Sequence, residues 1–420
     1  MTRDRSFAPD RRSFATDHRV LLETLASTDN LLIVQDLDGV CMGLKRDPLD
    51  RCLERRYLEA AERLAGRFYV LTNGEHIGTR GVNAIVERTL GGEARRAGLY
   101  LPGLAAGGVQ WQDRFGRIDH PGVSEAELAF LHDVPDKMRA FMAGHPAIAR
   151  FPPPARKALV RAAVLDNRAS PTLNLNGFYQ GLAEHPATWR ALQKETADFM
   201  ASLLTEAPDP AAFFIHYAPN AGRDESGRER LRPGDEAQSG TTDFQLMLRG
   251  AVKEAGVLSL LNRHIHERTG RYPLGEAFNA RQAPSTLEDL LALARERIAP
   301  ADMPTLVGVG DTLTSARTQG EWQRGGSDRG FLTLIQRLGE AFKRDNRVLF
   351  VDSSAGEVRR PGIDAEALAR SGETPAWHAF EGITDAEDPL RLDALFLDGY
   401  TEYVDFFCAL AERAPSGTPS

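Results

Sequence analysis

Four short apolar runs in this sequence each end abruptly in polar residues. Parallel strands that are covered by helices on both faces have this continuous apolar character. Ligands of open α/β sheets bind beyond the carboxyl ends of such strands. The recurrence predicts an α/β fold with a functional site at that edge of a parallel sheet. The runs and the residues that follow them are 31–35 before Asp36-Leu37-Asp38-Gly39, 68–71 before Thr72-Asn73-Gly74, 305–309 before Gly310-Asp311-Thr312, and 348–351 before Asp352.

The chain is too long between the second run and the third for a single strand-helix-strand crossover. Roughly 180 residues separate Thr72 from Lys253, which predicts an inserted domain. Its expected elements are strands over 159–165, 172–175 and 213–217, a helix over 186–204, and a long loop or return hinge over 223–242. We therefore expect a flexible lead-in over 1–20, a catalytic core of 21–110 and 245–420, and an inserted cap domain over 111–244.

Composition excludes several classes of function. The 420 residues carry a net charge of −8 and no basic run, which argues against nucleic acid as a partner. The longest apolar stretch, 97–109, contains Gly and Pro and falls short of the roughly 20 residues that span a bilayer. The amino terminus has no apolar segment of a secretory signal, and three scattered cysteines suit a reducing cytoplasm. A small-molecule partner in the cytoplasm is expected.

Asp36 and Asp38 have the spacing of an acidic pair that transfers a phosphoryl group. One carboxylate can attack phosphorus while the other protonates the leaving oxygen and then activates water. A carboxylate that approaches a phosphate dianion also needs positive charge, most simply Mg²⁺ held by oxygen ligands. Asp311 follows another strand and is expected to complete a metal site with Asp36 and Asp38.

Binding of the transferred group requires hydrogen-bond donors and a cation. Thr72 offers a hydroxyl group, and Asn73 is a weaker candidate because Asn-Gly sequences favour turns whatever their function. The sequence has 45 arginines and only 6 lysines, so each lysine is informative. Lys253, in an apparent helix, is the expected cation, with a solvated helix face as the alternative interpretation.

The order of these residues resembles that of the haloacid dehalogenase-like phosphohydrolases. The resemblance implies a Rossmann-like core with a cap at the type-two position, Asp36 as nucleophile, Asp38 as general acid and base, Thr72 and Lys253 on the phosphate, and Mg²⁺ on Asp36, Asp311 and the Asp38 backbone carbonyl. The sequence departs from the superfamily at Ser315 and Ala316, where a second acid usually follows Asp311. Asp328 is either the replacement ligand or a helix N-cap.

Four segments further resemble the glucosylglycerol-phosphate phosphatase family: LLIVQDLDGVCMGL, FYVLTNGEHIGTRGVN, GVGDTLTS and GGSDRGFLTLIQRLG. This resemblance implies hydrolysis of glucosylglycerol 3-phosphate in the synthesis of a compatible solute, with a functional link to the synthase that makes the substrate. Three alternatives remain open. They are a phosphatase for the sucrose, trehalose or mannosylglycerate type of substrate, a catalytically silent sugar-phosphate-binding regulator, and a phosphotransferase, which the cap position disfavours.

Overall fold

A computed structural model describes residues 14–225, 227–318, 320–370 and 376–414. Its core is an eight-stranded sheet with the order β16-β15-β12-β1-β2-β3-β4-β5, in which the first six strands are parallel, β4 pairs antiparallel with β3, and β5 pairs antiparallel with β4. The four apolar runs form four adjacent central strands, which confirms the α/β prediction. The strands are β1 (Leu31–Gln35), β2 (Phe68–Leu71), β3 (Gly103–Ala105), β4 (Gln110–Gln112), β5 (Ile118–Asp119), β12 (Thr305–Gly310), β15 (Arg347–Val351) and β16 (Ala394–Phe396).

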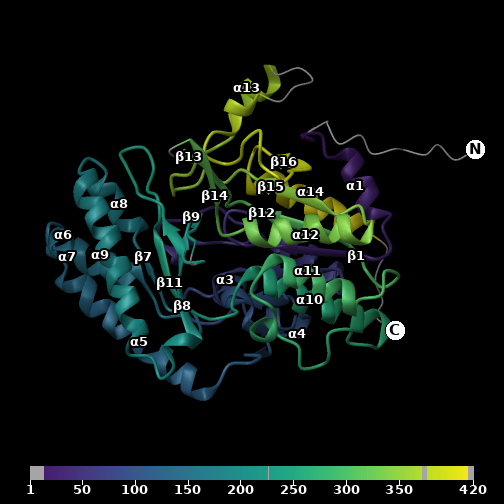
Figure 1. Cartoon of the computed structure of the whole chain (residues 1–420), viewed down its shortest axis with the longest axis horizontal. Helices are drawn as coiled ribbons and strands as arrows, with labels where there is room; N and C mark the ends of the chain where they lie inside the picture. Colours follow the sequence, from purple (N-terminus) through teal and green to yellow (C-terminus); the bar gives the residue numbers. More distant parts are fainter. Residues whose placement is uncertain (1–13, 226, 319, 371–375, 415–420) are drawn as a thin grey trace, which may run out of the picture.

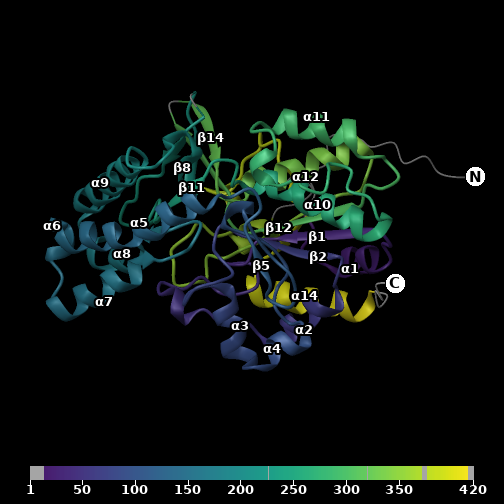
Figure 2. The ribbon, with the colours of Figure 1, turned by 90° about the horizontal axis from the view of Figure 1, so that it is seen from below.

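Helices cover both faces of this sheet, as Figure 2 shows. One face carries α10 (Lys253–Thr269), α11 (Leu287–Arg297) and α12 (Arg329–Phe342). The other carries α1 (Arg19–Ala26), α2 (Arg55–Arg63), α3 (Val82–Leu90), α4 (Glu93–Ala97) and α14 (Tyr400–Arg413). This two-sided cover explains why every residue of β1 is buried and why its sequence is apolar rather than alternating.

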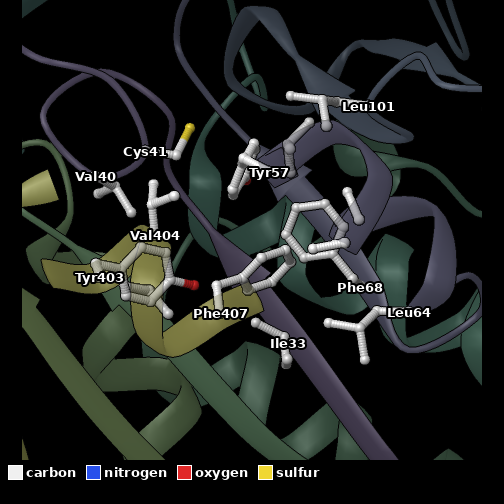
Figure 3. Close-up of a cluster of buried hydrophobic side chains, with 14 of the residues drawn as sticks. Ile33, Val40, Cys41, Tyr57, Leu64, Phe68, Leu101, Tyr403, Val404 and Phe407 are labelled. Carbon is white, nitrogen blue, oxygen red and sulfur yellow. The ribbon is translucent and has the colours of Figure 1, made fainter. Parts of the chain in front are cut away.

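The layer beneath β1 is an aromatic cluster between α2 and α14 (Figure 3). The rings of Tyr57 and Phe68 pack against Phe407, with centroids 5.0 Å from it in both cases. Gln35, the last residue of β1, is fully buried here, where its amide donates to the Tyr57 hydroxyl and its carbonyl accepts from Tyr403. These contacts fix the end of the strand that leads into Asp36.

The inserted cap stands beside the core with its own four-stranded antiparallel sheet, in the order β6-β7-β11-β8 (Figure 1). Its strands are β6 (Val164–Leu165), β7 (Thr172–Asn174), β8 (Phe213–Ala218) and β11 (Asp243–Leu248), and its helices are α5 (Glu125–Gly144), α6 (Pro146–Ala149), α7 (Pro153–Ala163), α8 (Asn176–Leu182) and α9 (Pro186–Leu204). The expected strand over 159–165 is wrong for most of its length, because a helix occupies it up to Ala163. Three consecutive prolines precede or open that helix, and proline at a first helical turn is well tolerated.

The chain passes from the core into the cap, and back again, at later residues than the expected 111 and 244. The strands that belong to each sheet show this. The β4–β5 hairpin extends the core sheet to Asp119, and β11 remains in the cap sheet to Leu248. The expected loop over 223–242 contains a short hairpin of β9 (Asn220–Arg223) and β10 (Glu229–Leu231), and a second hairpin of β13 (Thr314–Thr318) and β14 (Glu321–Gly325) projects from the core. In the described part of the chain, none of the helices has the length and apolar character required to traverse a bilayer.

Part of the expected flexible lead-in is fixed to the core. Residues 1–13 lie outside the described residues, but Ala15 pairs with Ala394 of β16 and the ring of Phe14 packs on Phe380. His18 stacks on Phe396 and lies within hydrogen-bond distance of a backbone carbonyl. The expectation of a free segment is therefore wrong for residues 14–20, because these side chains close the edge of the sheet.

Candidate active site

The loop after β1 carries Asp36 and Asp38 to the edge of the sheet where the neighbouring strands also end. Asp36 is 7% exposed, and its backbone N–H donates to Val309 in the adjacent strand β12. Gly39 turns the chain with a φ of +81°, and a Cβ there would lie 2.2 Å from Oδ2 of Asp311. Only glycine satisfies both the left-handed backbone and the close approach. The turn thus brings the β1 loop against the acid that follows β12.

Lys253 is the first residue of α10 and is almost completely buried. Its ammonium group lies 2.9 Å from Oδ2 of Asp36 and 2.7 Å from Oδ1 of Asp328, and 5.4 Å from the centroid of the Phe331 ring. Burial favours the neutral amine, but the charges of Asp328 and Asp36 outweigh it and raise the pKa of Lys253 above its usual range. The lysine is therefore a permanent buried cation beside Asp36, and the solvated-helix interpretation is wrong.

Asp36, Asp311 and Asp328 form a cluster in which one oxygen of each lies within 4.8 Å of the others. Asp328 joins α12 to this cluster from a fully buried position, and its Oδ2 accepts from the backbone N–H groups of Asp311 and Thr312 at 2.9 Å each. Asp328 precedes α12, but its side chain caps no N–H of that helix within the described chain. The structure therefore does not support a side-chain N-cap at Asp328, and the metal-ligand interpretation stays a prediction.

The cluster fits a divalent cation. Oδ1 of Asp36 and Oδ2 of Asp311 are buried and have no hydrogen-bond partner among the described residues. Burial, together with the charge of Asp328, raises the pKa of Asp36 to about 7 and that of Asp311 well above its ordinary value. Hard oxygen ligands of this kind suit Mg²⁺, whose charge would favour the ionised carboxylates.

The carboxylate of Asp38 lies apart from the acid cluster and faces a different cation. Nε of Arg51 lies 2.9 Å from Oδ1 of Asp38, an ion pair in which the N–H does not point at the oxygen, since neither atom makes a hydrogen bond among the described residues. The metal-ligand role expected of Asp38 concerns its backbone carbonyl, so the position of its side chain outside the cluster does not conflict with that expectation. Asp36 and Asp38 therefore occupy distinct environments two residues apart.

Thr72 and Asn73 follow β2, the strand next to β1. Thr72 is 3% exposed, and its Oγ1 accepts from the N–H of Gly74. The side-chain amide of Asn73 points toward the cap, where its Nδ2 lies 2.9 Å from Nε2 of His216. Nδ1 of that histidine lies 2.8 Å from the buried carboxylate of Glu229. Thr72 thus lies directly after β2 at the edge of the sheet, whereas the Asn73 side chain joins core to cap in this conformation.

Glu75, three residues beyond Thr72, joins the same loop to the cap through a second contact. Its buried carboxylate accepts from the backbone N–H groups of three consecutive cap residues, at 2.9 Å for Arg168, 2.6 Å for Ala169 and 2.9 Å for Ser170. Nε2 of Gln110 donates to it as well. Sequence reasoning missed Glu75, although an acid in a loop that follows a buried strand was the available signal.

One further residue near the acid cluster, Arg360, also escaped prediction. Arg360 lies beyond β15 and interacts electrostatically with Asp311, Asp328 and Asp243, a residue of the cap. The position where the superfamily usually has a second acid is occupied by Ser315, whose hydroxyl donates to Oδ2 of Asp385 at 2.5 Å. The third carboxylate of the acid cluster is that of Asp328, seventeen residues beyond Asp311.

Comparison with known proteins identifies the family of the chain. Residues 30–411 match the family described as glucosylglycerol-phosphate phosphatase. A glucosylglycerol-phosphate phosphatase of Synechocystis sp. is 49% identical over 415 residues, which cover 96% of this chain and 97% of that protein.

Two solved structures are more distant. The trehalose-6-phosphate phosphatase C-terminal domain of C. albicans is 9% identical, with a TM-score of 0.47 and coverage of 96% of this chain and 99% of the other. The trehalose-6-phosphate phosphatase of Aspergillus fumigatus is 11% identical, with a TM-score of 0.39 and coverage of 95% and 99%. The family match over nearly the whole chain carries the assignment: this chain belongs to the glucosylglycerol-phosphate phosphatase family.

Proposed function

We propose that this protein hydrolyses glucosylglycerol 3-phosphate to glucosylglycerol and phosphate through an aspartyl-phosphate on Asp36. The observation that carries the proposal is the convergence of Asp36, Lys253 and two further buried carboxylates at the carboxyl edge of the sheet. The family match supports the choice of substrate.

Asp36 and Asp38 divide the chemistry. The Asp36 carboxylate attacks phosphorus, and the Asp38 carboxyl group donates a proton to the leaving oxygen of glucosylglycerol. Asp38 then removes a proton from a water molecule, which attacks the aspartyl-phosphate and releases inorganic phosphate. The proton gained in this second step restores Asp38 for the next turnover.

Lys253 and Thr72 hold the phosphoryl oxygens. The ammonium group of Lys253 supplies a fixed positive charge that needs no reorganisation during the reaction, since it is buried beside Asp36. The hydroxyl of Thr72 and the adjacent backbone amides, including that of Asn73, add hydrogen-bond donors. The cap excludes bulk water from these interactions.

Asp36, Asp311 and Asp328 would hold Mg²⁺, together with the backbone carbonyl of Asp38. When bound, the cation neutralises charge on the phosphoryl group as the nucleophile approaches. Asp328 also holds Lys253 at 2.7 Å, so the residue would position the metal and the lysine together.

The proposed substrate places the enzyme after a glucosylglycerol-phosphate synthase, in the production of an osmolyte. A cytoplasmic enzyme would meet that substrate, and the three cysteines, all free, suit a reducing compartment.

Phosphate release tests the proposal. The purified protein is assayed with glucosylglycerol 3-phosphate, sucrose 6-phosphate, trehalose 6-phosphate and glucose 6-phosphate, each with Mg²⁺ and with EDTA. We expect selective, Mg²⁺-dependent release from the first substrate and its loss in Asp36→Asn. Preferred release from another sugar phosphate would refute the substrate, and near-full turnover by Asp36→Asn would refute the mechanism.

A further inference from the structure

The cap sheet has one apolar face and one polar face. The register pairs Asp243 with Asn174 and Gln245 with both Thr172 and His216, and side chains on paired and alternate residues share a face. The residues between them, including Phe244, belong to the apolar cluster under the cap helices. Four of the polar residues on this face are nevertheless buried, Asp243 is half-buried, and His216 meets Asn73 of the core there. Five polar side chains thus face the catalytic domain: Thr172, Asn174, His216, Asp243 and Gln245.

Asp243 is the charged member of this polar face, and it lies among groups of the core. Nδ2 of Asn174 donates to its Oδ1 at 2.7 Å. The polar face that carries Asp243 meets the core at Asn73, and the charge of Asp243 interacts with those of Arg360, Arg51 and Asp38 of the core. Burial raises the pKa of Asp243 to about 6, and the two arginines act in the opposite direction.

The core groups that interact with Asp243 have unused hydrogen-bonding capacity. Oδ1 of Asp38 and the Nε atoms of Arg51 and Arg360 are buried and make no hydrogen bond to any described residue. Oδ1 of Asp38 and Nε of Arg51 form an ion pair with each other at 2.9 Å, so their charges are partnered while their hydrogen-bonding capacity is not used. Buried groups with such capacity are ordinarily satisfied by a ligand or water. Their grouping opposite Asp243 marks a place where a polar ligand is received.

The in-line geometry of attack at phosphorus identifies which part of the substrate lies beside Asp38. The nucleophile and the leaving oxygen stand on opposite sides of phosphorus, and Asp38 must reach the leaving oxygen to protonate it. Lys253 lies on the phosphoryl side, because it bonds Asp36. The leaving group therefore emerges beside Asp38, toward Asp243 and the two arginines.

A cavity large enough for a glycosyl group lies between the cap and the core, and sequence neighbours of Asn174 and Arg360 line it. It measures about 580 Å³ and opens between α8 of the cap and two core loops, with Asn176, Tyr179, Arg46 and Arg359 in its lining. Asn176 is two residues from Asn174, and Arg359 is adjacent to Arg360. A second cavity of about 200 Å³ borders Lys253 and Asn73 instead, away from Asp38.

We propose that Asp243 recognises the leaving group by accepting hydrogen bonds from its hydroxyls, while Arg51 and Arg360 donate to the oxygens of the same group. A carboxylate flanked by guanidinium groups complements the paired donors and acceptors of a polyhydroxylated, uncharged glycosyl polyol. This inference rests on the proposed phosphatase function and adds the residues that select its substrate. Asn174 is a positioning residue, since it orients the Asp243 carboxylate.

The test compares two substrates of wild type and Asp243→Asn. Glucosylglycerol 3-phosphate presents hydroxyls to Asp243, whereas p-nitrophenyl phosphate has a leaving group with none and reports the phosphoryl chemistry alone. Hydrogen bonds to charged groups contribute about 1.5–3 kcal/mol, so kcat/KM for glucosylglycerol 3-phosphate should fall about 10- to 150-fold, mainly through KM. Turnover of p-nitrophenyl phosphate should stay within about 3-fold, which also shows that the variant is folded.

Two further variants complete the design. Asn174→Ala should give a smaller loss in the same substrate-selective direction, and Asp198→Asn, on the exposed side of α9, should leave both substrates unchanged. An equal loss on both substrates in Asp243→Asn, or no loss on glucosylglycerol 3-phosphate, would overturn the proposal. If wild type cleaves only a different glycosyl phosphate, the proposed function fails, and the same comparison with that substrate then decides the role of Asp243.

Discussion

The folding stability of the metal-free protein should fall as pH rises, because the buried acid cluster binds a proton that the unfolded chain releases. Burial raises the pKa of Asp36 from 3.8 to about 7. Between these two values the folded state holds a proton on Asp36 that the unfolded state has lost. Stability therefore decreases with pH across this window. The contribution is fully present below about pH 4 and is lost as pH passes about 7.

The size of the effect follows from the shift. A difference of about 3 pKa units corresponds to roughly 4 kcal/mol at 1.36 kcal/mol per unit, of which roughly 2.5 kcal/mol is lost between about pH 5 and pH 8. Asp36→Asn cannot titrate at this position, and it also removes a charge that raises the pKa of Asp311. The variant should therefore show a shallower decline than wild type over the same range.

Equilibrium urea unfolding in EDTA measures the decline, with wild type and Asp36→Asn compared from about pH 5 to pH 8. Mg²⁺ added at the higher pH should restore wild-type stability, by about 2.7 kcal/mol at one hundred times its dissociation constant, and restore the variant less. Parallel pH profiles of the two proteins in EDTA would refute the assignment of the proton to Asp36 and its neighbours.

Other substitutions test single contacts. Lys253→Met should lower kcat at least about 100-fold and destabilise the fold by about 3–5 kcal/mol, because it leaves two buried carboxylates unpaired; steady-state kinetics and urea unfolding check both. Asp328→Asn should raise the Mg²⁺ concentration needed for half-maximal activity at least about 10-fold, and an unchanged Mg²⁺ titration would remove Asp328 from the metal site. Gly39→Ala should abolish activity while circular dichroism stays native, because its Cβ would displace the Asp311 carboxylate. Glu75→Gln should destabilise the protein by about 1–3 kcal/mol in thermal unfolding, because the amide is a weaker acceptor for three backbone N–H groups.

The catalytic core was predictable because its signal is local. An apolar strand that ends in Asp36-Leu37-Asp38-Gly39 specifies both a buried position and the polar residues delivered there. Lys253 was recognisable for a compositional reason, since lysine is rare in this chain. For the opposite reason, Arg51 and Arg360 could not be singled out among 45 arginines. Only the fold shows that they face the catalytic acids.

The cap was less predictable because its elements depend on packing between segments far apart in sequence. The run 159–165 is apolar enough for a strand, and it is a helix because Pro153 opens a first turn that continues to Ala163. Asp243 is the first residue of β11, a strand that was not predicted and that begins directly after the expected loop over 223–242. The groups that interact with its carboxylate are Asn174 of the cap and two arginines of the core, and none of them is close to Asp243 in sequence.

The attachment of the cap through Glu75 has a consequence for how specificity can change. The carboxylate contacts the main chain of residues 168–170, with one added contact from the Ser170 hydroxyl. A hydrogen bond to a peptide group places few demands on the identity of the side chain that the peptide carries. The contact between Glu75 and residues 168–170 therefore tolerates substitution of the cap side chains. The cap surface opposite Asp38 can then change to fit a different leaving group without loss of this contact. In this architecture the attachment of the cap and its recognition surface can change independently.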